Sequence, residues 1–402
     1  MSADRWLGIV GIGEDGVEGL SPLARRMIEA AAAVFGGRRH LALAAPHVKG
    51  EAVEWPSPFT IEPLLARRGT PTVVLASGDP FLFGVGNVVA RHVPPAEYVA
   101  LPAPSAFSLA ASRLGWPLAE VTMLSLHGRS IDLVRPHLFP GARILALTSD
   151  AAAPTAIAAL LCGSGFGPSR LFLLEAMGGA DERMRDSRAA SFAMQAINPL
   201  NTLAIAVEAE PGARILPRAA GLDDALFETD GQITKREIRA LTLSALAPRP
   251  GECLVDIGAG SGSVAIEWML ADRRCRAIAI EPRGDRAARI RANAAAFGVP
   301  GLDVVEGAAP DALAGVPEAD AVFVGGGLSR PGVLAAALDL VRAGGRLVAN
   351  AVTLETERVL LGAHEERGGR LIRIAIDRAA PLAGMTAWEP ARPVLQWSWT
   401  KP

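Results

Sequence analysis

The pattern of hydrophobic and polar positions alternates along the first half of the chain between short apolar runs and longer segments with helical periodicity. We predict strands at residues 6–10, 71–76, 98–101, 121–124, 144–147, 170–174 and 203–207. Ser21 and Pro22 predict the start of a helix, with serine as the cap and proline in the first turn. Its apolar face is expected to carry Leu23, Met27, Ala30 and Val34. Successive strand–helix units with apolar strands indicate a mainly parallel sheet covered on both faces.

The periodicity fails between residues 208 and 231, where the composition is typical of linkers and turns. We place the boundary near residue 215, which gives domains 1–214 and 215–402. The second domain is expected to open with a helix at 235–246, whose apolar face carries Ile238, Leu241, Ala245 and Leu246. Strands are expected at 252–256, 276–280, 302–305, 320–324, 345–350, 370–377 and 394–399. Five parallel strands followed by a C-terminal hairpin would form a seven-stranded sheet.

A glycine-rich loop follows the first strand of the second domain. Gly258, Gly260 and Gly262 alternate directly before a predicted helix, and an acid, Glu281, ends the next strand 19 residues later. An acid at that place in a Rossmann-like sheet can hydrogen-bond a ribose diol. A dinucleotide loop would have its third glycine where this chain has Ser263. The loop therefore favours the sulfonium cofactor S-adenosylmethionine, and a methyltransferase, over a nicotinamide oxidoreductase. Its candidate contacts are Asp256, Gly258, Ala259, Gly260, Ser261, Gly262 and Glu281.

Other candidate site residues follow the remaining strands of the second domain. Thr234 begins a Thr-Lys-Arg-Glu capping box and is also a candidate cofactor contact. Ala308 and Ala309 lie after the third strand, where an adenine is expected. Gly326 and Arg330 follow the fourth strand, where the triple glycine leaves room for a flat macrocycle, and Asn350 and Glu355 follow the fifth strand as candidate polar contacts to substrate.

Composition excludes several function classes. Half the residues are hydrophobic, yet no apolar run reaches the length needed to cross a membrane, about 18 residues. A net charge of −2 argues against a nucleic-acid partner. The three cysteines are an odd number, and neither they nor the six histidines have the spacing of metal ligands. We therefore expect no metal site and a cytoplasmic location. We also expect a homo-oligomer.

In the first domain, a Gly-rich loop at residues 11–16 lacks an immediate helix, and its Glu14 and Asp15 would repel a phosphate. It is accompanied by Leu-Ala-Ser-Gly-Asp-Pro at 75–80, Pro-Ala-Pro-Ser-Ala-Phe at 102–107 and Ser-Leu-His-Gly-Arg at 125–129. Together these blocks resemble the tetrapyrrole methylases of cobalamin synthesis, which have the class III methyltransferase fold. The second domain resembles their companion decarboxylating methyltransferase of class I, Rossmann-like fold. The predicted fold class is therefore α/β in both domains.

The resemblance implies one S-adenosylmethionine site in each domain and a precorrin substrate. It implies methylation at C5 by the first domain, and methylation at C15 with loss of the C12 acetate by the second. Methylation of another tetrapyrrole, only one of the two methylations, and a catalytically idle carrier stay open as alternatives. First-domain cofactor contacts would be Gly11, Gly13, Ser77, Gly78, Asp79, Ser105, Ala106, Leu126 and His127. Arg38, Arg39, Arg129 and Arg330 are candidates for the substrate carboxylates, because guanidinium groups bind carboxylates in a forked geometry. No catalytic residue is assigned.

Overall fold

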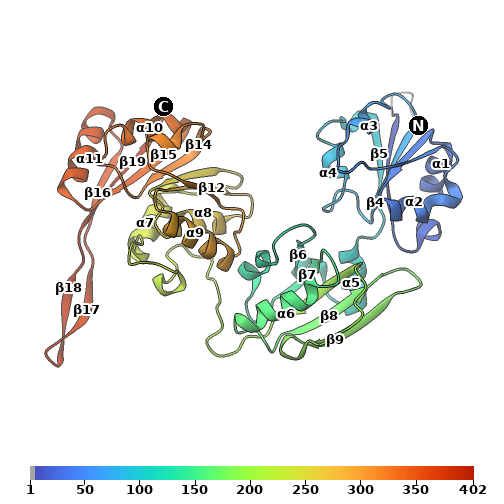
Figure 1. Ribbon diagram of the computed structural model, residues 1–402, viewed down its shortest axis with the longest axis horizontal. Helices are drawn as coiled ribbons and strands as arrows, with labels where there is room; N and C mark the ends of the chain where they lie inside the picture. Colours follow the sequence, from blue (N-terminus) through green and yellow to red (C-terminus); the bar gives the residue numbers. More distant parts are fainter. Residues whose placement is uncertain (1–4) are drawn as a thin grey trace. The chain divides into compact units, whose positions relative to one another are not determined.

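The computed structural model describes residues 5–402 (Figure 1). They form two compact units: the first contains the chain up to Ile131 and His137–Arg214, and the second contains Ile215–Pro402 with Asp132–Pro136. Each unit is an α/β structure with its own hydrophobic core.

The first sheet of unit 1 has five parallel strands in the order β3-β2-β4-β1-β5. The strands are β1 (Leu7–Ile12), β2 (Ala33–Gly36), β3 (Glu51–Glu54), β4 (Thr72–Ser77) and β5 (Tyr98–Leu101), and the helices on the same stretch of chain are α1 (Pro22–Ala30), α2 (Arg38–Ala44), α3 (Glu62–Leu65) and α4 (Gly86–Val89). The predicted cap of α1 is confirmed, because the Ala24 N–H donates to the Ser21 hydroxyl at 3.2 Å.

Two strands of this sheet, β2 and β3, were not predicted. The run of alanines after α1 has helical composition, but the helix ends at Ala30 and the chain is already extended at Ala31. Val34 therefore lies on β2, and the prediction that it belongs to the helix face is wrong. Leu23, 45% exposed, and Ala30, also exposed, are not part of that face either. Met27 is buried as predicted, together with Ala24 and Ile28.

The second sheet of unit 1 is mixed, with the order β6-β7-β10-β8-β9. Its strands are β6 (Val121–Ser125), β7 (Arg143–Leu147), β8 (Arg170–Glu175), β9 (Arg183–Arg188) and β10 (Asn201–Ala206), accompanied by helices α5 (Ala106–Leu114) and α6 (Ala153–Gly163). Only β6 and β7 pair in parallel, so the expectation of one mainly parallel sheet is wrong for this half of the unit. Strand β9 escaped prediction because charged residues dominate it; Arg183 and Arg185 pair with the buried Glu175 on β8.

Unit 2 contains the predicted seven-stranded sheet, in the order β13-β12-β11-β14-β15-β19-β16. The strands are β11 (Cys253–Ile257), β12 (Arg276–Glu281), β13 (Asp303–Glu306), β14 (Ala319–Val324), β15 (Val341–Ala351), β16 (Arg370–Ile374) and β19 (Val394–Thr400), with helices α7 (Arg236–Leu246), α8 (Ser263–Ala271), α9 (Gly284–Ala296), α10 (Val333–Leu340) and α11 (Leu354–Arg367). The first five strands in this order are parallel, and β19 is antiparallel to both β15 and β16. The carboxyl ends of the parallel strands therefore meet at one edge of the sheet.

Helix α7 begins one residue later than the capping box requires. Its cap is Lys235, which makes no side-chain cap bond, so the predicted capping role of Thr234 is wrong. Leu241 is 43% exposed and does not belong to the buried face, where Ile238, Leu243 and Leu246 lie.

An additional two-stranded ribbon separates the last strands of the sheet. The predicted strand at 370–377 ends at Ile374 as β16, and the chain continues into β17 (Asp377–Leu382) and β18 (Met385–Pro390), which extend away from the sheet (Figure 1). Leu382, Met385 and Trp388 on this ribbon are 60–75% exposed. Because it buries little surface, the ribbon has no apolar alternation by which it could be predicted.

Within residues 5–402, no helix is both long and apolar enough to cross a bilayer. The same part of the chain holds no cluster of three or more histidine, cysteine, aspartate or glutamate side chains arranged to hold a metal ion.

Candidate active site

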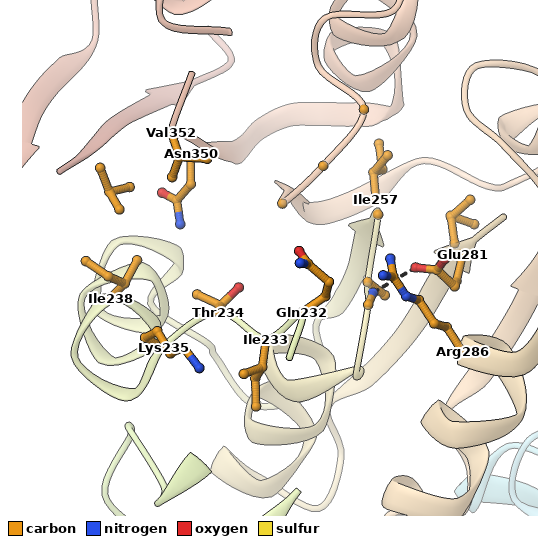
Figure 2. Close-up of a pocket in the computed structure, with 18 of the residues that line it drawn as sticks. Gln232, Ile233, Thr234, Lys235, Ile238, Ile257, Glu281, Arg286, Asn350 and Val352 are labelled. Carbon is orange, nitrogen blue, oxygen red and sulfur yellow. Dashed lines mark hydrogen bonds between the residues drawn. The ribbon is translucent and has the colours of Figure 1, made fainter. Parts of the chain in front are cut away.

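A cavity of about 600 Å³ opens in unit 2 at the carboxyl ends of the parallel strands (Figure 2). This is the edge at which open α/β sheets bind their ligands. Ten of the predicted contacts line it: Thr234, Gly258, Ala259, Gly260, Glu281, Ala308, Ala309, Gly326, Arg330 and Asn350. The cavity also contacts residues that were not predicted, among them Gln232, Lys235, Arg378 and Arg392.

The glycine loop after β11 has a backbone shape that only glycine adopts readily. Gly258, Gly260 and Gly262 have φ angles of 73°, 61° and 76°, in the left-handed region. A Cβ at position 258 would lie 2.9 Å from the backbone of Gly326, and one at 262 would lie 2.8 Å from the Ile290 side chain. Gly262 is thus required for packing on α9 and is absent from the cavity wall, whereas Gly258 and Gly260 form part of it.

Glu281 places a buried carboxylate beside this loop. Glu281 is only 2% exposed. Its carboxylate accepts hydrogen bonds from the N–H of Gly260 at 2.8 Å and from the N–H of Arg283 at 3.2 Å. A carboxylate has about four acceptor positions, so lone pairs remain for hydroxyl donors in the cavity. The geometry suits recognition of a ribose diol.

Asp256 lies beneath the loop and does not reach the cavity wall. Its Oδ2 atom accepts from the Ala265 N–H at 3.2 Å, whereas Oδ1 is buried with no hydrogen-bond partner within residues 5–402. The pKa of Asp256 is raised to about 7, mainly by burial and in part by the charge of Glu281, although the hydrogen bond from the Ala265 N–H opposes the shift. The Ser261 hydroxyl is likewise buried and without a partner among the described residues. Neither predicted residue lines the cavity.

These observations fit S-adenosylmethionine. The glycine loop leaves its backbone open to a ligand, and the buried carboxyl group of Glu281 lies beside it with that of Asp256 beneath it. Two acids suit a cationic nucleoside. The same carboxylates would repel a pyrophosphate. Of the cations that line the cavity, Arg286, which lies beside Glu281 in Figure 2, is paired with Asp230 at 2.8 Å.

Thr234 reaches the cavity because a buried arginine fixes the segment before α7. Arg239 is fully buried and donates to the Thr234 carbonyl, to Asp224 at 2.9 Å and to Glu267 at 2.5 Å. The segment is therefore held over the glycine loop, and Figure 2 shows Gln232 and Thr234 at this wall. Arg239 was not predicted, since nothing in the local sequence distinguishes it from a surface arginine.

The remaining wall of the cavity is formed by the loop after β14, by the last residues of β15 and by the base of the ribbon. Gly326, against the backbone of Gly258, begins this wall, and Arg330, Asn350, Arg378 and Arg392 continue it. Glu355 does not, because it is exposed in the first turn of α11, where a backbone N–H lowers the pKa of its carboxyl group. Its predicted role as a substrate contact is not supported by this position.

Unit 1 has a separate cavity of about 890 Å³, lined by residues of both its sheets. Of the predicted residues, it contacts Gly13, Ser77, Gly78, Ser105, Ala106, His127, Arg39 and Arg129. Four predicted residues lie elsewhere: Gly11, Asp79, Leu126 and Arg38.

Each of these four has a structural reason for its place. Gly11 packs against the Gly78 carbonyl and the Ala103 N–H, where a side chain would not fit. Asp79 accepts from the Phe81 N–H at 2.8 Å and shapes the turn after β4. Leu126 is 1% exposed, and Arg38 extends into solvent with its guanidinium 3.6 Å from Glu54.

A polar cluster that the sequence did not reveal lies in the unit 1 cavity. The Ser77 hydroxyl is 2.9 Å from an Arg39 nitrogen and 2.8 Å from His40 Nε2, and Arg39 also pairs with Glu14. Burial, assisted by the charge of Arg39, lowers the pKa of His40 to about 4, so the imidazole is neutral near pH 7. His40 was missed because it follows β2, which was also missed.

The chain has two α/β units, and each has its own cavity. In unit 2, the glycine loop and an acid placed to bind a ribose line that cavity. These features define a two-domain methyltransferase. Residues 7–193 match the family described as Tetrapyrrole (Corrin/Porphyrin) Methylases, and residues 225–401 match the Precorrin methyltransferase domain. The chain is 62% identical over 398 residues to precorrin-6Y C(5,15)-methyltransferase [decarboxylating] of Sinorhizobium sp, covering 98% of this chain and 96% of the relative. It therefore belongs to the family of decarboxylating precorrin-6Y C5,15-methyltransferases, whose methyltransferase domains use S-adenosylmethionine.

Two further relatives are informative. The Mycobacterium tuberculosis protein of the same name is 41% identical over 401 residues, 98% of this chain and 99% of that protein. A shorter relative from Saccharolobus solfataricus, named a probable cobalt-precorrin-6B C(15)-methyltransferase (decarboxylating), is 34% identical over 193 residues, which are 45% of this chain and 96% of the relative.

Proposed function

We propose that the chain methylates a precorrin at C5 and at C15 and removes the C12 acetate as CO2, with one S-adenosylmethionine site in each unit. Family membership supports the reaction, and two separate cavities, of about 600 and 890 Å³, support two cofactor sites. The observation that carries the second site is the Gly258–Gly260 cradle beside the buried Glu281.

We further propose that residues 1–214 methylate C5 and that residues 215–402 methylate C15 and decarboxylate. The shorter relative supports this division, because its name carries the C15 methylation and the decarboxylation without C5 methylation. The loops that line the two cavities also differ between the units. Each unit is therefore suited to its own arrangement of methyl donor and tetrapyrrole acceptor.

Bound S-adenosylmethionine supplies an electrophilic methyl group, and the meso carbons of a reduced tetrapyrrole are enamine-like nucleophiles. The side chains then need to align the reactants and exclude water, which contributes on the order of 7–11 kcal/mol. Glu281, Thr234 and the loop would hold the nucleoside in unit 2; Ser77, Gly78 and Ser105 would do so in unit 1. Arg39, Arg129 and Arg330, which line the cavities, would contact substrate carboxylates.

Titration calorimetry of the full chain with S-adenosylhomocysteine tests the two sites, with an expected stoichiometry near two per chain. Incubation with precorrin-6Y and S-adenosylmethionine tests the reaction, with two methyl groups gained and one CO2 released per tetrapyrrole. A stoichiometry of one, or a product with a single added methyl, would contradict the proposal.

We also propose a cytoplasmic, self-associating enzyme that has no nucleic-acid partner. All three cysteines are free thiols, as a reducing compartment allows, and the net charge of −2 gives no basic footprint. The exposed Leu382, Met385 and Trp388 of the ribbon support self-association. Light scattering of the purified chain would measure the mass of the assembly.

A further inference from the structure

Three polar side chains form a closed hydrogen-bonded group beside the unit 2 cavity, on the wall that also contains Arg330 and Arg392. Asn350 Nδ2 donates to the Thr242 hydroxyl at 3.0 Å, and Gln396 Nε2 donates to the same hydroxyl at 3.1 Å and to Asn350 Oδ1 at 3.0 Å. Thr242 is completely buried and Gln396 is 3% exposed. Asn350 and Gln396 face each other across the antiparallel pair β15–β19.

The Thr242 hydroxyl fixes the orientation of both amides. Its single hydrogen is donated to the Ile238 carbonyl at 2.8 Å, one turn earlier in α7. The oxygen can therefore only accept, and its two lone pairs receive the two amide N–H groups. A rotated Asn350 amide would place its oxygen against another acceptor, so the asparagine is held in one orientation.

The locked amide still has hydrogen-bonding capacity for a ligand. Asn350 uses one of its two N–H groups on Thr242 and one lone pair on Gln396, which leaves one donor and one acceptor position. Its side chain lines the cavity, and Figure 2 shows the carboxamide directed toward the wall that contains Thr234 and Ile238.

Asn350 differs in charge from the other donors on this wall of the cavity. Arg330, Arg378 and Arg392 also line it, and Arg378 is paired with Glu237. Over residues 5–402, Arg330 and Arg392 have no ion-pair partner. The cavity thus presents two unpaired guanidinium groups and one neutral, rigidly oriented amide.

We propose that Asn350 holds the acetate carboxylate that leaves as CO2, and that Thr242 and Gln396 position it for this task. The inference rests on the proposed function and assigns roles within the same site. Arg330 and Arg392 would bind carboxylates that remain on the substrate.

The chemistry of decarboxylation separates these two kinds of donor. After methyl transfer at C15, the bond between the acetate methylene and its carboxylate breaks, CO2 departs, and the electron pair neutralises the iminium conjugated with that ring. A proton from water then converts the methylene to a methyl group, and loss of the C15 hydrogen to water as a proton restores the neutral macrocycle. The carboxylate loses its charge in this step, so a guanidinium pair would stabilise the reactant more than the transition state. A neutral N–H fixes the torsion of the acetate with less of that penalty.

The ratio of CO2 released to methyl transferred at C15, measured on the full chain with S-adenosylmethionine and substrate, tests the proposal. We expect Asn350→Ala to lower this ratio about tenfold, because a freely rotating acetate would seldom align the breaking bond with the conjugated iminium. A C15-methylated product that keeps its acetate should accumulate and be visible by mass spectrometry. Asn350→Asp should lower the ratio further, because it adds a negative charge.

Paired variants distinguish positioning from folding. Thr242→Val removes the shared acceptor and should lower the ratio, whereas Thr242→Ser keeps the hydroxyl and should restore it. Gln396→Leu should act like Thr242→Val. Ser398→Ala, two residues along β19 and outside the group, is the matched control and should leave the ratio at one. The melting temperature and S-adenosylhomocysteine affinity are measured for every variant.

Three results would overturn the inference: an unchanged ratio in Asn350→Ala, an equal fall in methylation and CO2 release, or equal ratios in Thr242→Val and Thr242→Ser. Failure of the proposed function looks different, since the unaltered chain would then transfer no methyl group to C15 or release no CO2.

Discussion

The N–H of Gly260 donates a hydrogen bond to Oε2 of Glu281 at 2.8 Å, across 21 residues of sequence. The adjacent parallel strands β11 and β12 bring the loop and the acid together at the same sheet edge. Because Gly260 has a φ of 61°, its N–H can point at the carboxylate, and because Glu281 is 2% exposed, water competes little for that bond. One contact therefore shapes the loop and orients the acid.

Replacement of Glu281 by alanine should depress C15 methylation and CO2 release in parallel. The lost ribose hydrogen bonds are worth about 1.5–3 kcal/mol for bonds to a charged group, which corresponds to about 10- to 150-fold. Glu281→Gln, which keeps an acceptor, should lose less. Single-turnover assays at subsaturating S-adenosylmethionine measure both rates, and a change in C5 methylation would contradict the separation of the two sites.

Gly260→Val should remove one of two cofactor sites. The branched side chain would lie in a left-handed backbone position, with its Cβ 3.1 Å from the Gln232 carbonyl at the cavity wall. We expect the S-adenosylhomocysteine stoichiometry to fall from two to one per chain and C5 methylation to persist. Gly301→Val is the matched control, because that glycine has open space around it and an ordinary φ. Equal loss of both methylations in folded Gly260→Val would contradict this expectation.

The sequence predicted best those parts in which local chemistry and tertiary packing coincide. The strand–glycine–helix segment and Glu281 could be predicted because apolar strands, obligatory glycines and an acid at fixed spacing share one cause, the cavity at the sheet edge. Strands β2, β3 and β9 could not, because alanine composition favoured helix and because the charge of β9 is balanced only by its neighbour Glu175.

The same distinction applies to the site. Gly258, Gly260 and Asn350 line the predicted cavity, but the residues that hold them do not stand out in sequence. Arg239 is a buried anchor only because Glu267, 28 residues away, lies opposite it. Likewise, Gln396 is 46 residues from Asn350 and meets it only through the strand register. Such partners depend on tertiary pairing, which a local pattern does not contain.

Arg39 and Arg38 form a natural matched pair in unit 1. Arg39 lines the cavity and contacts Ser77, whereas the Arg38 side chain is 88% exposed. Arg39→Ala should weaken C5 methylation about 10-fold or more, because it removes a charged contact to substrate and frees Glu14 and Ser77. Arg38→Ala should leave the rate within about twofold, as expected for a surface ion pair. Equal effects of the two variants on C5 methylation would contradict the assignment of Arg39.

Asp256 should make the stability of unit 2 depend on pH. Since its folded-state pKa is raised from 3.8 to about 7, the folded protein binds this proton more tightly than the unfolded chain does. The contribution of Asp256 to stability is therefore greatest below about pH 4, falls as the pH rises to about 7, and is level above that. Asp256→Asn should show a gain in melting temperature relative to the unaltered chain that grows between pH 4 and 7. A gain independent of pH would show that Asp256 is ionised throughout.

Decarboxylation should depend on prior methyl transfer at C15. Loss of a carboxylate needs a place for two electrons, and no residue lining the unit 2 cavity offers a covalent sink. Lys235, the one lysine there, directly precedes α7, and its side chain is 52% exposed with Nζ 3.9 Å from Asp224. It is therefore not enclosed in an apolar pocket, as the lysines that form Schiff bases are. The acceptor is then the iminium that forms in the substrate when C15 gains the methyl group.

S-Adenosylhomocysteine fills the cofactor site but has no methyl to give. We therefore expect it to abolish CO2 release, with full recovery when excess S-adenosylmethionine displaces it. Measurable CO2 from substrate and enzyme without a methyl donor would refute this order and point to an acid at the Arg330 or Asn350 end of the cavity that protonates the macrocycle directly.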